Sequence, residues 1–197
     1  MKVVLASANS GKLRELAALA APLGWELVPQ QALGIGSADE TGETFRDNAL
    51  LKARHAARTS GLAALADDSG IEVDALGGRP GVYSARYAGD HATDRQNLEK
   101  LLAELREVPP ERRTARYRCV IAYVAGADDP APILAEGRWE GRIGVAPRGA
   151  GGFGYDPIFL PLDSGGRTAA ELGRKEKDAV SHRALALAML RERLSGD

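Results

Sequence analysis

Short apolar runs alternate with amphipathic stretches along the first half of the chain. Residues 2–7 ("KVVLAS") are a short β-branched run, which predicts a buried strand. Next, Leu13, Leu16 and Ala20 recur at helical spacing, and Gly24 is a typical helix stop. The same reasoning predicts strands at 25–29, 62–66, 115–126, 131–144 and within 151–161, and helices at 43–59, 94–108 and 178–194. Alternation followed by clustered strands favours an α/β fold with a mixed sheet and a second lobe.

Two aspartates, Asp67 and Asp68, stand side by side directly after the apolar run 62–66 ("LAALA"). One polar residue suffices to end a strand, so we expect the strand to stop here and the paired charges to bind a cation. Mg²⁺ prefers a few carboxylates together with water and phosphate oxygens. A carboxylate there can also take a proton from an attacking water. An Asx-type turn explains one aspartate well and the second poorly.

The composition is that of an ordinary globular protein. The chain has 197 residues, 44% of them hydrophobic and 27% charged, which suits one domain of residues 1–197 built of two lobes. Its 26 basic and 27 acidic residues leave a net charge of −1, so nothing favours a nucleic acid or an anionic membrane as a partner. Any bound anion must therefore be held by a local cluster.

Cys119 is the only cysteine, so the chain can form neither an internal disulfide nor a cage of thiolates around a metal. The first residues turn polar after a very short apolar run, unlike a secretory signal. No segment approaches the roughly 18 apolar residues of a membrane span. These features predict a soluble, cytoplasmic protein.

The loop of residues 7–12 ("SANSGK") is a candidate phosphate site between a strand and a helix. Backbone amides at a helix start favour an anion, and Lys12 adds a full positive charge. Ala6 and Leu13 break the Walker A pattern, so the loop is not a P-loop. A turn with a solvated lysine is an equal alternative.

A second cation, Lys52, shares a helix face with Asn48 and is another phosphate candidate, or it extends from the edge of the core into solvent. Asp39 and Glu40 precede this helix in a glycine-containing loop, where a carboxylate can swing toward a hard cation. Acids near a helix start also oppose its dipole favourably, which is the simpler reading.

Glycines surround Phe153 and Tyr155 in the stretch 151–157 ("GGFGYDP"). A ring there can lie over a planar base while Asp156 accepts from ring N–H groups, although a hairpin turn explains the pattern too. Basic residues in 174–184 ("RKEKDAVSHRA") are either a solvated face or donors to a carbonyl or phosphate. Taken together, these stretches describe a nucleoside triphosphate site without a Walker A loop.

In these motifs the chain resembles the inosine triphosphate pyrophosphatase family. The matching segments are "SANSGK", "ETGETFRDNALLKA", "ADDSGIEVDALGGRPGVYSARYAG", "GGFGYDPIF" and "TAAELGRKEKDAVSHR". They follow the family's order and run nearly end to end. The resemblance implies an elongated two-lobed α/β fold around a long mixed sheet, a nucleotide cleft between the lobes, and a homodimer.

The resemblance also assigns roles to individual residues. Asp68 would be the catalytic base and a magnesium ligand, Asp67 would support it, and Asp39 or Glu40 would supply the second metal-linked carboxylate. The residues implied to contact the purine nucleoside triphosphate are Ser7, Ala8, Asn9, Ser10, Gly11, Lys12, Lys52, Ser69, Phe153, Gly154, Tyr155, Asp156, Lys177, His182 and Arg183.

The implied reaction is Mg²⁺-dependent hydrolysis of ITP, dITP or XTP to the monophosphate and pyrophosphate, which cleanses the nucleotide pool. Two alternatives stay open. One is a pyrophosphatase with a different base choice, such as the Maf-type enzymes, and the other is a nucleotide-binding protein without turnover.

Overall fold

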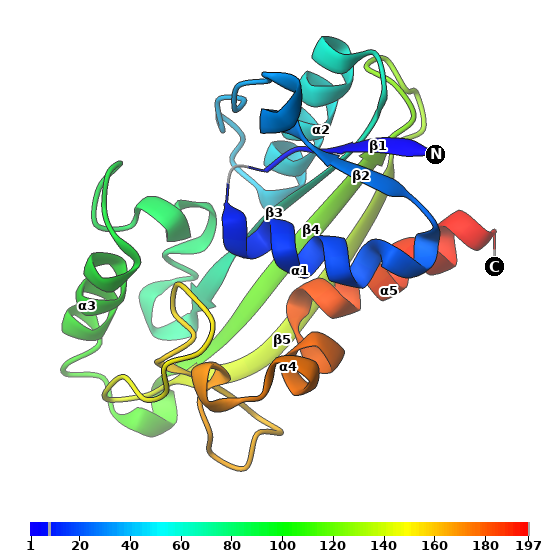
Figure 1. Cartoon of the computed structure of the whole chain (residues 1–197). Helices are drawn as coiled ribbons and strands as arrows, with labels where there is room; N and C mark the ends of the chain where they lie inside the picture. The colour runs from blue at the N-terminus through cyan, green and yellow to red at the C-terminus, as the bar shows by residue number, and fades with distance from the viewer. Residues whose placement is uncertain (8, 197) are drawn as a thin grey trace. The chain divides into compact units, whose positions relative to one another are not determined.

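The computed structural model describes residues 1–7 and 9–196, and within them a six-stranded mixed sheet. Its strands are β1 (Lys2–Leu5), β2 (Glu26–Pro29), β3 (Ala63–Val73), β4 (Thr114–Val124), β5 (Ile133–Ile143) and β6 (Phe159–Pro161). They lie in the order β2-β1-β3-β4-β5-β6. Figure 1 labels the strands β1 to β5. β1 pairs in parallel with β2 and β3, whereas β5 and β6 are antiparallel. The mixed α/β sheet expected from the sequence is therefore confirmed.

Five α-helices accompany the sheet in the described residues. They are α1 (Ser10–Ala20), α2 (Phe45–Ser60), α3 (Asp94–Glu104), α4 (Arg174–Val180) and α5 (His182–Ser195). Local sequence sets the bounds of α2, because the Thr44 side chain accepts from the Asp47 amide and the left-handed Gly61 ends the helix. Thr93 and Gln96 form a capping box at the start of α3. None of the helices within residues 1–7 and 9–196 has the length and apolar character needed to cross a membrane.

The chain divides into two compact units, each with a hydrophobic core of its own. The first comprises residues 1–68, 119–137 and 182–197, and the second comprises 69–118 and 138–181. In the first unit, β1, β3 and β4 pack with α1 and α5 around Leu5, Leu65 and Leu187. In the second unit the core gathers around Ile71, Trp139 and Phe159. The Phe159 ring meets those of Tyr117 and Trp139 edge to face. The expectation that both units form one functional domain stays a prediction.

The structure corrects two predicted boundaries. The strand expected to end at residue 66 continues as β3 through Val73, so Asp67 and Asp68 lie inside a strand. Buried charges are tolerated there because each carboxylate is paired with a lysine. The single helix expected from 178 to 194 is interrupted, since Ser181 is extended (φ −68°, ψ 157°) and separates α4 from α5.

Candidate functional site

The loop between β1 and α1 is held by its own polar groups. Asn9 Oδ1 accepts from the backbone amides of Gly11 at 2.9 Å and Lys12 at 3.0 Å, and the Asn9 amide donates to Ser7 Oγ at 3.2 Å. These are the amides that the sequence assigns to phosphate, so a ligand would compete with Asn9 for them. Ala8 lies outside the described residues, and the Ser10 backbone begins α1.

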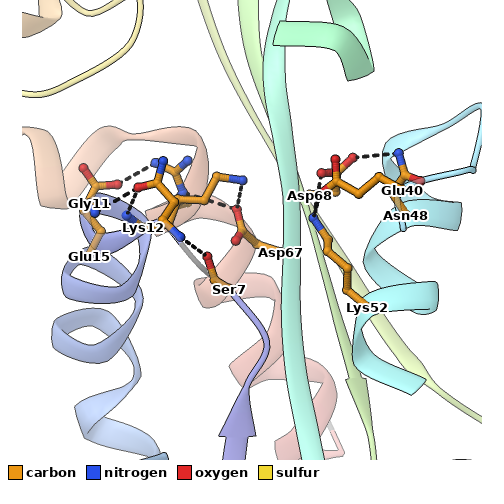
Figure 2. A network of polar contacts seen from close by, with 11 residues as sticks. Ser7, Gly11, Lys12, Glu15, Glu40, Asn48, Lys52, Asp67 and Asp68 are labelled. Atoms are coloured by element: carbon orange, nitrogen blue, oxygen red, sulfur yellow. Dashed lines mark hydrogen bonds and ion pairs between the residues drawn. The ribbon is translucent and has the colours of Figure 1, made fainter. Parts of the chain in front are cut away.

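The adjacent aspartates of β3 point to opposite faces of the strand, as consecutive strand residues must. Figure 2 shows Asp67 directed toward α1 and Asp68 directed toward α2. Each carboxylate therefore belongs to a different cluster of the first unit. The side-by-side charges are not two ligands facing one point.

On the α2 side, Asp68 is bound by two residues of that helix. Lys52 Nζ lies 2.8 Å from Asp68 Oδ1, and Asn48 Nδ2 lies 3.3 Å from Asp68 Oδ2. Asn48 and Lys52 are four residues apart, which places both on one face of α2. The Asn48 side-chain oxygen also accepts from the Gly42 amide at 2.8 Å and so ties the preceding loop to the helix. α2 thereby orients the proposed catalytic carboxylate from two directions.

Glu40 brings a second carboxylate to the same lysine. Its Oε1 lies 2.8 Å from Lys52 Nζ, so the Lys52 ammonium bridges Glu40 and Asp68. Asp39, the other candidate, is exposed, whereas Glu40 is half-buried. This geometry favours Glu40 as the carboxylate that acts together with Asp68.

Burial and charge shift these groups in different directions. Burial is the largest influence on Asp68 and raises the pKa of its carboxyl, although the nearby Lys52 and Lys12 charges oppose the change. Burial lowers the pKa of Lys52, but the charges of Asp68, Asp67 and Glu40 outweigh it and raise this pKa above its usual value. Lys52 is therefore an ammonium group at neutral pH. A carboxyl with a raised pKa is a stronger proton acceptor once it is ionised.

On the α1 side, Asp67 is fully buried and lies between two cations. Lys12 Nζ is 3.1 Å and Arg183 Nε is 3.5 Å from Asp67 Oδ2. Arg183 also donates from Nη1 to Glu15 Oε2 at 2.6 Å. Burial by itself raises the pKa of the Asp67 carboxyl, yet the Lys12 and Arg183 charges prevail and hold this pKa well below its usual range. Asp67 is thus an ionised anchor beneath the loop, and buried His182 precedes Arg183 in α5.

In the second unit, the glycine loop is organised around buried Asp156. Its Oδ2 accepts from the Phe153 amide at 2.9 Å and from Lys177 Nζ at 2.7 Å. The Lys177 ammonium also lies 5.2 Å from the centre of the Phe153 ring, a cation–π distance. Asp156 Oδ2 thus shapes the loop, and the predicted contact of Asp156 with ring N–H groups of a base stays a prediction.

The remaining loop residues are tied to other elements of the same unit. Tyr155 is buried and donates to the Ser84 backbone oxygen at 2.8 Å, while the Gly154 amide donates to Asp94 Oδ2 at 2.8 Å. Ser69 is half-buried on β3. The sequence offered no sign of the contacts from Asp94 and Ser84, because both residues lie far from the loop along the chain.

The sequence and fold of this chain match those of known proteins. The model of the Ham1 family matches residues 3–193, nearly the whole chain. The chain belongs to the Ham1 family.

Curated relatives and solved structures agree with the Ham1 assignment. A Shigella flexneri protein named dITP/XTP pyrophosphatase is 57% identical over 193 residues, which is 98% of each chain. The Salmonella typhi protein of the same name is 58% identical over the same share. The structure of a HAM1 protein from Coxiella burnetii has a TM-score of 0.91 at 48% identity and covers 100% of both chains. The resemblance drawn from the five motifs is thereby confirmed.

Two carboxylates of this chain form a donor set that fits a divalent cation. Glu40 and Asp68 both place a carboxylate oxygen 2.8 Å from Lys52 Nζ, so two anionic oxygens already converge on one positive charge. Two carboxylates, completed by water and phosphate oxygens, suit Mg²⁺. The residues present therefore fit the ion, although no cluster of three or more potential metal-binding side chains exists among residues 1–7 and 9–196.

Proposed function

We propose that this chain is a nucleoside triphosphate pyrophosphatase that hydrolyses ITP, dITP and XTP. Water adds to the α-phosphorus and the α–β phosphoanhydride bond breaks, which gives the nucleoside monophosphate and pyrophosphate. The observation that carries the proposal is the buried Asp68–Lys52 pair at 2.8 Å. It occurs in a chain that is 57% identical to a protein named dITP/XTP pyrophosphatase over 98% of its length.

Asp68 is the residue best suited to accept the proton of the attacking water. It is held on one side by Lys52 and on the other by Asn48, so its orientation is fixed before substrate arrives. Its neighbour Asp67 cannot do this work, because its side chain is 0% exposed, whereas that of Asp68 is 7% exposed. A general base must reach the water that it deprotonates.

Positive charge for the triphosphate comes from Lys12 and Lys52. The Lys12 side chain is 16% exposed and that of Lys52 is 12% exposed, so both retain access to a ligand. Ammonium groups held in place before the reaction stabilise the charge that develops on departing pyrophosphate. Each lysine is oriented by its own aspartate, so little reorganisation is needed when the charge appears.

Glu40 and Asp68 would hold Mg²⁺, which when bound would offset the negative charge of the triphosphate. The bridging contact of Lys52 with both Glu40 and Asp68 supports this role for the two carboxylates.

Base selection follows from hydrogen bonding. Inosine and xanthine carry an oxo group at C6, where adenine carries an amino group, so a buried donor such as His182 favours the first two. Leaving a buried donor unpaired can discriminate by roughly 10⁴. The roles of Ser69, Phe153, Tyr155 and Lys177 in base binding follow from the family motif.

Two further expectations belong to this proposal. The enzyme would act in the cytoplasm, where purine nucleotides are made and used, and it would be a homodimer. Family membership over residues 3–193 supports the homodimer. Relatives named dITP/XTP pyrophosphatase support a site of action where purine nucleotides are used.

The proposal is tested by incubating the protein with Mg²⁺ and, separately, ITP, XTP, dITP, ATP, GTP and a pyrimidine triphosphate. Products are separated by ion-exchange chromatography. We expect IMP and pyrophosphate in equal amounts from ITP and much slower turnover of ATP. Release of orthophosphate as the primary product would rule out α–β cleavage. Preference for the pyrimidine would favour a Maf-type activity, and binding without turnover would favour a non-catalytic protein.

A further inference from the structure

The Asp67 side chain lies where it can take no direct part in the proposed reaction. Its side chain is 0% exposed, and it points to the face of β3 opposite Asp68 (Figure 2). Neither substrate nor water reaches a carboxylate in that position. Any effect of Asp67 on catalysis must therefore pass through the groups that it contacts.

Those contacts join three elements through alternating charges. Asp67 Oδ2 lies 3.1 Å from Lys12 Nζ of α1 and 3.5 Å from Arg183 Nε of α5. Arg183 Nη1 in turn reaches Glu15 Oε2 of α1 at 2.6 Å. The two cations and two carboxylates balance, which is what a buried ionic group requires. The result is a row of ion pairs that runs Lys12–Asp67–Arg183–Glu15.

A gain in folding stability alone is a weak explanation for such a row of buried ion pairs. Buried ion pairs are often no more stabilising than well-packed apolar residues of the same volume. Their distinctive property is that they fix particular atoms in particular places. Here one fixed atom, Lys12 Nζ, belongs to a side chain that is 16% exposed, whereas Arg183 is 4% exposed. The row of ion pairs therefore has one end, Lys12, that remains accessible to a ligand.

We propose that Asp67 is a positioning residue that holds the Lys12 ammonium and the Arg183 guanidinium on one carboxylate oxygen. It thereby aligns the phosphate loop, residues 7–12, with the first turn of α5. This inference rests on the proposed function, because it assigns Lys12 to phosphate. His182 directly precedes Arg183, so the contact of Arg183 with Asp67 also fixes the position of His182, the candidate donor to the base.

A double-mutant cycle of Asp67→Asn and Lys12→Ala tests the inference, with kcat and KM measured for ITP. Asp67→Asn keeps the shape of the side chain and removes its charge. We expect it to raise KM for ITP about tenfold, within the range of coupling between charged residues in contact. Lys12→Ala should then cost much less in the Asp67→Asn background than in the wild type. Fully additive effects on kcat/KM would overturn the proposal.

Inorganic tripolyphosphate separates this inference from the proposed function. It has no base and needs no turnover, so calorimetric binding reports on the groups that hold phosphate, Lys12 among them, without any contribution from base binding or catalysis. We expect Asp67→Asn to weaken tripolyphosphate binding about tenfold. Equal binding by both proteins would overturn the inference, whatever the enzyme does with ITP. Failure of the wild type to hydrolyse ITP would instead count against the proposed function.

Glu15→Gln provides a second test that puts less of the fold at risk, because Glu15 is partly exposed and Asp67 keeps both cations. We expect a raised KM for ITP with kcat little changed, because Arg183 is held less firmly. An unchanged KM would contradict the coupling through α5. Glu26→Gln serves as the control, since Glu26 forms only an exposed pair with Lys2 in the part of the chain that the structure describes.

Discussion

Asp67 and Asp68 are consecutive residues of β3, yet each is paired with a different lysine. Lys12 Nζ lies 3.1 Å from Asp67 Oδ2, whereas Lys52 Nζ lies 2.8 Å from Asp68 Oδ1. The alternation of a strand sends the two carboxylates to opposite faces, so the like charges are not forced together. Asp67 becomes part of the frame beneath the phosphate loop, and Asp68 remains with Glu40 for the chemistry.

The contact between Glu40 and Lys52 predicts which acid of the loop matters. Glu40→Gln should lower kcat/KM for ITP by at least about 10- to 100-fold, because losing even a residue that only orients the ligands of a metal typically costs that much. Asp39→Asn, the matched change one residue earlier, should stay within about twofold, since Asp39 is exposed. Steady-state kinetics across a Mg²⁺ titration measures both. Equal losses, or a larger loss for Asp39→Asn, would contradict the assignment.

The lowered pKa of Asp67 predicts a pH-dependent contribution to stability. A carboxyl whose pKa is lower in the folded state stabilises the fold above the unfolded pKa of about 3.9, and this stability is lost as pH falls through the folded value. Asp67→Asn should lower the free energy of unfolding by about 3–5 kcal/mol near pH 7, because Arg183 is left buried beside a neutral group.

Urea unfolding of wild type and Asp67→Asn from pH 7 down to pH 3 checks this prediction. The difference between the two proteins should be constant above about pH 5 and should narrow below about pH 4, where the wild-type carboxyl begins to lose its advantage. A difference that stays the same across this range would show that Asp67 is not an ionised anchor.

Gly137 of β5 permits the close approach of α5. A Cβ at this position would lie 2.0 Å from the His182 backbone oxygen and 2.5 Å from the Ala186 amide nitrogen. Gly137→Ala should therefore destabilise the protein by about 1–3 kcal/mol, as overpacking usually does. Gly126→Ala is the control, because a Cβ there meets nothing within 4 Å. Denaturant unfolding of both variants is the measurement, and similar midpoints would contradict the prediction.

The buried Asp156–Lys177 pair should contribute strongly to the stability of the second unit. Both side chains are buried, so Asp156→Ala leaves the Lys177 ammonium without its carboxylate and should cost about 3–5 kcal/mol. Asp178→Ala removes the partner of the exposed Arg174 and should cost at most about 1 kcal/mol. Thermal unfolding of the two variants compares them. A small cost for Asp156→Ala would mean that the loop does not depend on the pair.

Local pattern predicted the elements of this fold better than their limits. The strands at 2–7 and 115–126 and the helix at 43–59 were confirmed, because apolar periodicity reports a buried face directly. The strand at 62–66 was ended too early, since its continuation depends on Lys12 and Lys52, which no local pattern pairs with it. The break at Ser181 was missed because serine inside a basic stretch resembles an exposed helical position.

Some residues of the candidate site could be predicted from the sequence, and others could not. Residues in long motifs, such as Asp68 and Lys52, could be singled out from the sequence, and the structure brings these two within hydrogen-bonding distance. Glu15 could not, because its partner Arg183 is 168 positions away and an acid on an amphipathic helix usually faces solvent. The choice between Asp39 and Glu40 also needed three dimensions, since both lie in one flexible-looking loop sequence.

Hydrolysis of ITP in water enriched in oxygen-18 tests the central claim most directly. If Asp68 directs water to the α-phosphorus, mass spectrometry will find one oxygen-18 atom in IMP and none in pyrophosphate. Asp68→Asn, shown to be folded at the assay temperature, should abolish this incorporation almost completely. Oxygen-18 in the pyrophosphate would place the attack on the β-phosphorus, and that result would contradict the account.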